Sequence, residues 1–308
     1  MKANHEISSS LLANESDPVF KNEFFSRFEL RKAPHSLRLT DQVEKHYQFP
    51  TFYGNVTCGI GIFHCDYEKA RRLLPSSRIK PVRMPRGRAL VTFSCYEYRN
   101  VMNVAPYHEI AMTIPVLLES AMDLPVLPVL LGSKYPGFGY YVFGMPVTSK
   151  ENQIRGNQIW GLPKITQDIE TFEEKFNGQD HFVTEAFENS GEKYFSLRIP
   201  MRGKPQRFDV SADLFSFLDQ RMLVSQTAFD SIFQVVKNPA LLFKRAGTAS
   251  AGVAVSSAAT GGKSPLWIGT TESARTLREL DIESEAFQFR FTRGMSAAFD
   301  LPRKEYTL

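Results

Sequence analysis

Strand-like segments that follow one another through short turns are the feature that most restricts how this chain can fold. Residues 89–98 are β-rich, with a polar residue at most even positions from Thr92 to Tyr98, as in a sheet with one face against a core. Further segments of strand character are 55–63, 137–143, 181–187, 193–199, 205–210 and 287–291. Because short turns rather than helices join many of them, we expect antiparallel pairing. No Gly-x-Gly-x-x-Gly or Walker-type loop follows a strand, so a nucleotide-binding fold is unsupported.

The composition is typical of a globular protein and argues against several classes of partner. A formal net charge of +4 over 308 residues is too small to indicate nucleic-acid binding. No apolar run approaches the roughly 18 residues of a membrane span, and the N-terminus shows no apolar signal segment. The three cysteines, Cys58, Cys65 and Cys95, lie in strand-like contexts and are predicted to be reduced core residues. Histidines are scattered without metal-ligand spacing. We therefore predict a cytoplasmic protein without nucleic-acid, membrane or metal partners.

The chain divides at about residue 50. Residues 1–50 are polar and charge-dense, which predicts an N-terminal arm that is either partly disordered or wrapped around a neighbouring subunit. Residues 51–308 contain no repeat and no clean linker, so we predict a single domain there. The Pro- and Leu-rich run 124–131 is an apolar connector that packs on this domain or between subunits, and it favours a homo-oligomer. The small-residue stretch 246–262 is either a flexible surface loop or a substrate lid.

One lysine stands out chemically. A helix capped by Thr148 or Ser149 is expected to end at Gly156, and residues 156–164 then lead through a Gly and a Pro into a strand that begins at Lys164. An amine held in apolar surroundings loses hydration, which lowers its pKa and makes it nucleophilic near neutral pH. The alternative is a lysine whose stem packs on Trp160 while its head reaches water.

Two motifs resemble those of a known family. The pattern Gly-x-x-x-x-Gly-x-Pro-Lys over residues 156–164, with Trp160 inside it, resembles the Schiff-base segment of the acetoacetate decarboxylase family. Residues 106–116 resemble the family's Tyr-x-Glu strand, which ends in Ile-Pro-Val. The resemblance extends from about Asn55 to about Phe172. It implies an α+β fold dominated by a closed, mostly antiparallel β-barrel with peripheral helices. It also implies that Lys164 faces the interior and that a covalent lysine imine takes the place of a cofactor.

The sequence departs from the family at several charged positions. A second lysine would follow the nucleophile, but Ile165 stands there. An arginine that would receive the substrate carboxylate aligns near Val56, and the earlier of two carboxylates falls on Ser94. The usual Arg-Glu pair after the first glycine is Asn157-Gln158. These changes leave the amine chemistry intact, with Ile165 compensating partly through desolvation, but they argue against a small anionic substrate.

The basic turn 83–88 offers a replacement for the missing arginine. It contains Arg83, Arg86 and Arg88, although such a turn is most often a solvated loop. If the substrate is an acid, one of these guanidinium groups would receive its carboxylate.

The Tyr-x-Glu strand supplies the predicted partners of Lys164. Period-2 alternation places Tyr107 and Glu109 on one face and His108 on the other, where we expect it to serve in packing. Glu109 either has a raised pKa and moves protons, or forms an ion pair with Arg99 or another base. Tyr107 would hydrogen-bond the substrate oxygen. The remaining candidates for contact with substrate are Ser94, Gln158, Trp160 and Pro163.

A neutral lysine amine that forms an iminium with a ketone or aldehyde creates an electron sink for cleavage of a bond at the adjacent carbon. We predict a Schiff-base-forming lyase that acts through Lys164 on a carbonyl compound larger and less charged than acetoacetate. Aldol-type cleavage, condensation or dehydration is favoured over decarboxylation. A true β-keto acid decarboxylase is one alternative, and a non-catalytic small-molecule-binding barrel is another.

Overall fold

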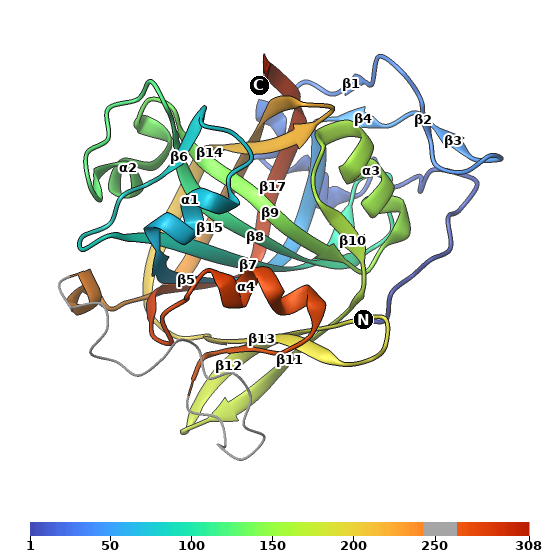
Figure 1. Ribbon diagram of the computed structural model, residues 1–308. Coiled ribbons are helices and arrows are strands. Elements are labelled where there is room, and N and C mark those ends of the chain that lie inside the picture. The colour runs from blue at the N-terminus through green and yellow to red at the C-terminus, as the bar shows by residue number, and fades with distance from the viewer. Residues whose placement is uncertain (243–263, 308) are drawn as a thin grey trace.

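A computed structural model of the protein describes residues 1–242 and 264–307 (Figure 1). Its centre is a closed barrel of seven strands, hydrogen-bonded in the order β9-β14-β15-β17-β5-β7-β8 and back to β9. These strands are β5 Thr51–Asp66, β7 Arg88–Val101, β8 Tyr107–Leu118, β9 Phe138–Val147, β14 Lys204–Leu218, β15 Arg221–Lys237 and β17 Ala286–Thr307. Closure leaves no unpaired barrel edge. The expected mostly antiparallel barrel is confirmed.

One pairing in the barrel is parallel. Strand β14 pairs with β9 in parallel, with Leu214 opposite Tyr140. The short strand β10, Lys164–Thr166, also runs parallel to β9 on its other side. The chain between β9 and β14 passes through a helix and a second sheet, so it returns by a crossover and not by a hairpin. Strand β6, Ile79–Pro81, extends the sheet beside β8.

A second sheet of four strands covers the outside of the barrel. It consists of β11 Asp168–Phe176, β12 Gln179–Phe187, β13 Lys193–Pro200 and β16 Leu266–Ile268, and it lies below the barrel in Figure 1. The two sheets approach closely because β5 carries Gly59 and Gly61 on the shared face. A Cβ atom at Gly59 would lie 2.6 Å from Ile199 and 2.8 Å from Phe182, so no larger side chain fits there. The main hydrophobic core fills the space between barrel and sheet.

Helices lie at the periphery. They are α1 Tyr67–Leu73, α2 Leu127–Leu131, α3 Lys150–Trp160 and α4 Arg275–Glu279, with short 3-10 helices η1 Pro18–Lys21, η2 Phe25–Arg27, η3 Gly132–Lys134, η4 Pro239–Leu242 and η5 Glu272–Ala274. Asp66 caps the start of α1, since its carboxylate accepts a hydrogen bond of 2.8 Å from the amide of Lys69. None of the helices in the described ranges has the length and hydrophobicity that a membrane crossing requires.

The helix before Lys164 is longer than predicted. Helix α3 does not end at Gly156 but continues to Trp160, and Gly161 ends it with a left-handed φ of 60°. Gly161 is suited to this position because it carries no Cβ, whereas Gly156 lies inside the helix for a different reason, described below. At the start of the helix, the Ser149 hydroxyl accepts a hydrogen bond from the amide of Asn152.

Residues 1–50 pack along the barrel wall and onto α3. They contain the two-residue strands β1 Arg31–Lys32, β2 Leu37–Arg38, β3 Glu44–Lys45 and β4 Gln48–Phe49. Phe20, Phe24 and Phe25 form a small buried cluster with Phe52 of β5, with ring centroids of Phe25 and Phe52 4.7 Å apart. These aromatic contacts fix the arm to its own barrel.

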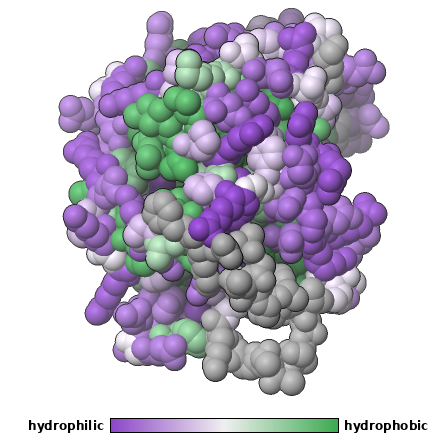
Figure 2. Space-filling view, turned by 60° about the vertical axis from the view of Figure 1, so that its left-hand side comes forward, coloured by the Kyte–Doolittle hydropathy of each residue, from purple (hydrophilic) through white to green (hydrophobic). Residues whose placement is uncertain are grey.

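The segment that contains α2 is apolar and exposed. Met122 and Leu130 are 70% and 71% exposed, and Leu124 and Leu131 are also exposed. Figure 2 brings this side of the molecule forward and shows hydrophobic side chains gathered among hydrophilic ones. The predicted loop or lid at 246–262 lies outside the described residues.

Candidate active site

Lys164 and Glu109 form a buried ion pair. Strand β9 brings them together, because it pairs with β10 at Lys164 and with β8 at Glu109. The Nζ atom of Lys164 donates a hydrogen bond of 2.6 Å to Oε2 of Glu109, and each side chain is 6% exposed. Arg99, the other partner considered for Glu109, instead pairs with Glu97 at 3.1 Å.

The stem of Lys164 crosses the backbone of α3. A Cβ atom at Gly156 would lie 2.7 Å from Cε of Lys164 and 2.9 Å from its Cγ. Gly156 therefore makes room for the lysine, and this explains a glycine inside a helix. The alternative in which the stem packs on Trp160 with its head in water is excluded, because the ammonium group lies on Glu109. Ile165 is 44% exposed, so it does not desolvate the lysine as we had expected.

Tyrosines surround the pair. The Tyr98 hydroxyl donates a hydrogen bond of 3.2 Å to Oε1 of Glu109, and the ring of Tyr107 lies 5.8 Å from Nζ of Lys164. Rings of Tyr53 and Tyr98 are 4.7 Å apart, and those of Tyr98 and Tyr107 are 4.8 Å apart. Burial raises the pKa of Tyr53 to about 12 and the pKa values of Tyr98 and Tyr107 well above their usual range. All three hydroxyls therefore remain protonated donors at neutral pH.

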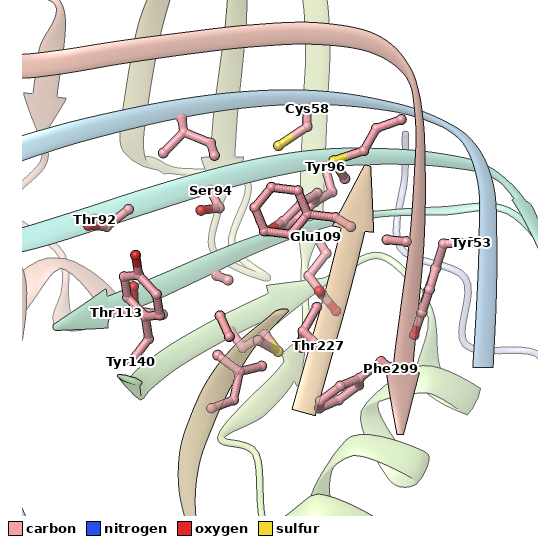
Figure 3. A pocket seen from close by; sticks show the side chains of 18 of the residues that line it. Tyr53, Cys58, Thr92, Ser94, Tyr96, Glu109, Thr113, Tyr140, Thr227 and Phe299 are labelled. Atoms are coloured by element: carbon pink, nitrogen blue, oxygen red, sulfur yellow. The ribbon is translucent and has the colours of Figure 1, made fainter. Parts of the chain in front are cut away.

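Lys164 and Glu109 both line a cavity inside the barrel, and Figure 3 shows Glu109 among the side chains of its wall. The cavity encloses about 150 Å³, whereas one water molecule needs only about 10–15 Å³. Its wall is largely apolar, with Ile60, Ile62, Met145, Leu214 and Phe233 among the lining residues. A few polar groups in an apolar, enclosed space are typical of small-molecule sites.

The predicted contact residues lie in different places. Ser94 lines the cavity, in register with Ala111 of β8. Gln158 and Pro163 are exposed and do not line the cavity. Trp160 and Tyr107 are buried behind its wall. Trp160 donates a hydrogen bond of 2.8 Å to the carbonyl of Asp300 and stacks on Phe299, which does line the cavity.

His108 packs on the opposite face from Glu109, as alternation predicts. Its Nδ1 lies 3.3 Å from the carbonyl oxygen of Ile169, and burial lowers its pKa. It is therefore neutral at physiological pH and serves in packing.

The basic turn 83–88 does not contribute to the cavity wall. Arg83 pairs with Asp123 at 2.9 Å, and Arg88 pairs with Glu283 at 3.0 Å. The arginine that does line the cavity is Arg290 of β17, which is not among the residues predicted from the sequence. Alternation in 287–291 separates the phenylalanines from Gln288 and Arg290, but alternation alone does not tell which face is inside the barrel.

No cluster of His, Cys, Asp and Glu suited to a metal ion occurs in residues 1–242 and 264–307. Cys58, Cys65 and Cys95 are free and buried, and burial raises their pKa values. The nucleophile candidate that lines the cavity with a paired acid is thus Lys164.

Comparisons with known proteins agree with this geometry. The family model for acetoacetate decarboxylase (ADC) matches residues 36–236, more than half of the chain. The crystal structure of acetoacetate decarboxylase from Legionella pneumophila subsp. pneumophila is similar with a TM-score of 0.56 at 13% identity, covering 99% of each chain. A second acetoacetate decarboxylase structure gives 0.53 at 11% identity, covering 84% of this chain and 89% of that one. A search of curated protein sequences gives no match. The structural similarity supports the fold, and the family model shows that the chain belongs to the acetoacetate decarboxylase family.

Proposed function

We propose that this protein is a Schiff-base-forming lyase in which Lys164 attacks the carbonyl carbon of a small-molecule substrate. The observation that carries the proposal is the Lys164–Glu109 pair, 2.6 Å apart and buried in the wall of an apolar cavity. An enclosed lysine with a carboxylate in hydrogen-bond contact has both the nucleophile and the proton acceptor that imine formation requires.

The proposed chemistry begins with transfer of the ammonium proton from Lys164 to Glu109. The neutral amine adds to the carbonyl carbon, and one of its two protons moves to the oxygen to give a carbinolamine. Glu109 then returns its proton to the hydroxyl group, so that water leaves and an iminium remains. Tyr98 lines the cavity and contacts Glu109, and it is better placed than Tyr107 to donate a hydrogen bond to the substrate oxygen. We propose that Tyr107 supports the cationic nitrogen through its ring instead.

The iminium then accepts electrons from a bond at the adjacent carbon. For aldol-type cleavage, the Glu109 carboxylate removes the proton of the β-hydroxyl group, the carbon–carbon bond breaks, and an enamine forms. Protonation of the enamine carbon by Glu109 and hydrolysis release the second product. Condensation is the reverse, and dehydration loses the β-hydroxyl as water.

Decarboxylation of acetoacetate is the less favoured reaction. Val56, near which the family's carboxylate-binding arginine aligns, is completely buried among apolar residues. Charged hydrogen bonds to a carboxylate contribute roughly 1.5–3 kcal/mol each, and their loss weakens binding of a small keto acid.

The test combines trapping with a product assay. Borohydride reduction in the presence of a ketone should fix a secondary amine on Lys164, detected by peptide mass mapping. Carbon dioxide release from acetoacetate should fall far below ordinary enzyme rates of about 10 per second. Absence of an adduct on Lys164 would contradict Schiff-base chemistry. Rapid carbon dioxide release that Lys164→Ala abolishes would establish a decarboxylase instead.

A non-catalytic binding barrel is the second candidate. The ion pair favours it, since an ammonium group held by a carboxylate is not a nucleophile until it loses a proton. Pentane-2,4-dione discriminates between the two, because its enaminone with a neutral lysine absorbs in the near ultraviolet. No such band at neutral pH would favour the binding function.

We also propose that the protein is a cytoplasmic homo-oligomer. The exposed apolar residues around α2 would lie at its interface, and the free, buried cysteines suit a reducing compartment. A monomer in sedimentation at micromolar concentration would contradict the oligomer.

A further inference from the structure

The cavity has a second polar end, remote from Lys164. Figure 3 shows Thr92, Thr113 and Tyr140 together at one end of the cavity, away from Glu109. Glu109 and Thr113 both face the cavity from β8 and are four residues apart, roughly 13 Å along a strand. The Oγ1 atom of Thr92 is buried and has no hydrogen-bond partner in the part of the chain that the structure describes. Unsatisfied buried hydroxyls are uncommon and call for a partner.

Arg290 points to this end. It is opposite Ile60 of β5 in the barrel register, and its Nε and Nη2 atoms donate hydrogen bonds of 3.0 and 2.8 Å to Oε1 of Gln288. The neighbouring row of the barrel crosses four strands. It contains Gln288 of β17, Ile62 of β5, Thr92 of β7 and Thr113 of β8. The guanidinium group therefore leans toward the row that contains the two threonines.

The charge of Arg290 is not neutralised. Across residues 1–242 and 264–307, no Asp or Glu forms an ion pair with it, and its other contact is the face of Phe208, 4.6 Å from the ring centroid. Burial lowers the pKa of the guanidinium group, although an arginine keeps its charge at neutral pH. Arg290 is half-buried at the cavity, and a guanidinium group there without a counter-ion is free to bind an anion held in the cavity.

We propose that Arg290, with Thr92 and Tyr140, forms a carboxylate subsite, and that the substrate is an elongated oxo acid. Its carbonyl group would lie at Lys164 and its carboxylate at Arg290, with an apolar chain between them along Ile60, Ile62 and Leu214. The substrate class rests on the proposed function of Lys164. The planar guanidinium fork suits a carboxylate, since it offers paired donors to two oxygens.

This arrangement differs from a clamp beside the reacting carbon. Arg290 is in the row of Ile60, Ser94 and Ala111, two residues or roughly 7 Å along β8 from the row of Glu109, and its guanidinium group leans further away, toward the row of Thr113. A carboxylate several bonds from the carbonyl therefore reaches Arg290 better than one adjacent to it. The subsite therefore selects substrates by length as well as by charge.

Two measurements test the subsite. Methyl ketones with a terminal carboxylate and two, four or six intervening methylene groups are compared with their methyl esters, which keep length and carbonyl but lose the charge. Calorimetry gives binding, and cyanoborohydride trapping on Lys164 gives imine formation. We expect the longest acid to bind at least about 10-fold more tightly than its ester, as one charged hydrogen-bonded contact allows. Arg290→Gln should remove this preference and Arg290→Lys should retain most of it.

The ratio of acid to ester binding is measured within each variant, so a partial loss of folded protein cancels. Equal binding of acid and ester in the wild type, or a preference that survives in Arg290→Gln, would overturn the subsite. Failure of trapping with an intact acid preference would instead overturn the proposed chemistry of Lys164 and leave the subsite standing.

Discussion

Two buried lysine–glutamate pairs lie beside α3, and their contrast shows what burial does and does not do. Lys45 Nζ is 2.9 Å from Glu151, with side chains 3% and 11% exposed, and Lys164 Nζ is 2.6 Å from Glu109, with both 6% exposed. By distance and exposure the pairs are alike. They differ in what they face: Lys164 and Glu109 line the cavity, and Lys45 and Glu151 do not.

Further contacts surround the Lys45–Glu151 pair. The Tyr47 hydroxyl donates a hydrogen bond of 2.6 Å to Glu151, and the guanidinium group of Arg155 lies 4.2 Å above the Tyr47 ring. Glu151 therefore ties residues 44–47 to α3. Burial and pairing are common to Lys45 and to Lys164, the proposed nucleophile, whereas contact with the cavity separates them.

The largest expected difference is in reactivity. Lys164→Met should abolish the near-ultraviolet band with pentane-2,4-dione and the borohydride-trapped mass, because no other cavity-lining lysine is present in the described residues. Lys45→Met should leave both signals within about a factor of two of wild type. Lys45 does not line the cavity, and substitutions at sites that share no partners usually act independently. A folded Lys45→Met protein without adduct would erase the contrast.

Stability should show the opposite order. Glu151→Gln leaves Lys45 unpaired in dry surroundings and should reduce the free energy of unfolding by about 3–5 kcal/mol. Glu109→Gln leaves Lys164 at a cavity that admits water, so we expect a loss of roughly 1–2 kcal/mol. Urea unfolding measures both. If Glu109→Gln proved the more damaging, the pair at the cavity would be the main structural one.

The two glutamates should also differ in proton transfer. Glu109→Gln should slow exchange of deuterium at the carbon beside a ketone carbonyl by roughly 100-fold, the scale of general acid–base catalysis. Nuclear magnetic resonance follows this exchange directly. Glu151→Gln is the matched control and should exchange normally at temperatures where it is folded. A normal rate in Glu109→Gln would assign the proton transfer to another group.

At alkaline pH, the tyrosines that contact the two pairs should affect stability in the same way. Burial raises the pKa values of Tyr47 and Tyr98, so the folded protein keeps these protons where unfolded tyrosines, with a pKa of about 10, lose them. The stabilisation is complete below about pH 10 and declines above it by about 1.4 kcal/mol per pH unit for each tyrosine. Tyr47→Phe and Tyr98→Phe should each flatten the fall of the melting temperature above pH 10. Slopes equal to wild type would contradict the burial effect.

Sequence reasoning located the Lys164–Glu109 pair and missed its surroundings. Lys164 and Glu109 follow from two local motifs whose strands must meet if the barrel forms. The predicted end of α3 at Gly156 is one turn too early, because Gly156 provides room for the side chain of Lys164 and does not end the helix. The polar face of 89–98 is inside the barrel, where Thr92 and Ser94 line the cavity, and Phe93 and Cys95 face the second sheet. Alternation shows that a strand has two faces, but the topology decides which is inside.

The other pair was beyond local reasoning. Lys45 and Glu151 are 106 residues apart, and the polar composition of residues 1–50 gave no reason to expect a buried lysine there. Arg290 was missed in the same way, since its meaning depends on a barrel closed by residues far away in the chain.

Strand β5 has a consequence for how a barrel of this kind changes during evolution. Cys58, Ile60 and Ile62 face the cavity, while Gly59 and Gly61 between them contact the second sheet. Substitutions at the first set reshape the space for a ligand without altering the contact between the sheets. Substitutions at the glycines would force those sheets apart and leave the ligand space without its support. Along one strand, therefore, the even-numbered residues can change when the ligand changes, while the odd-numbered glycines must stay glycine to keep the two sheets in contact.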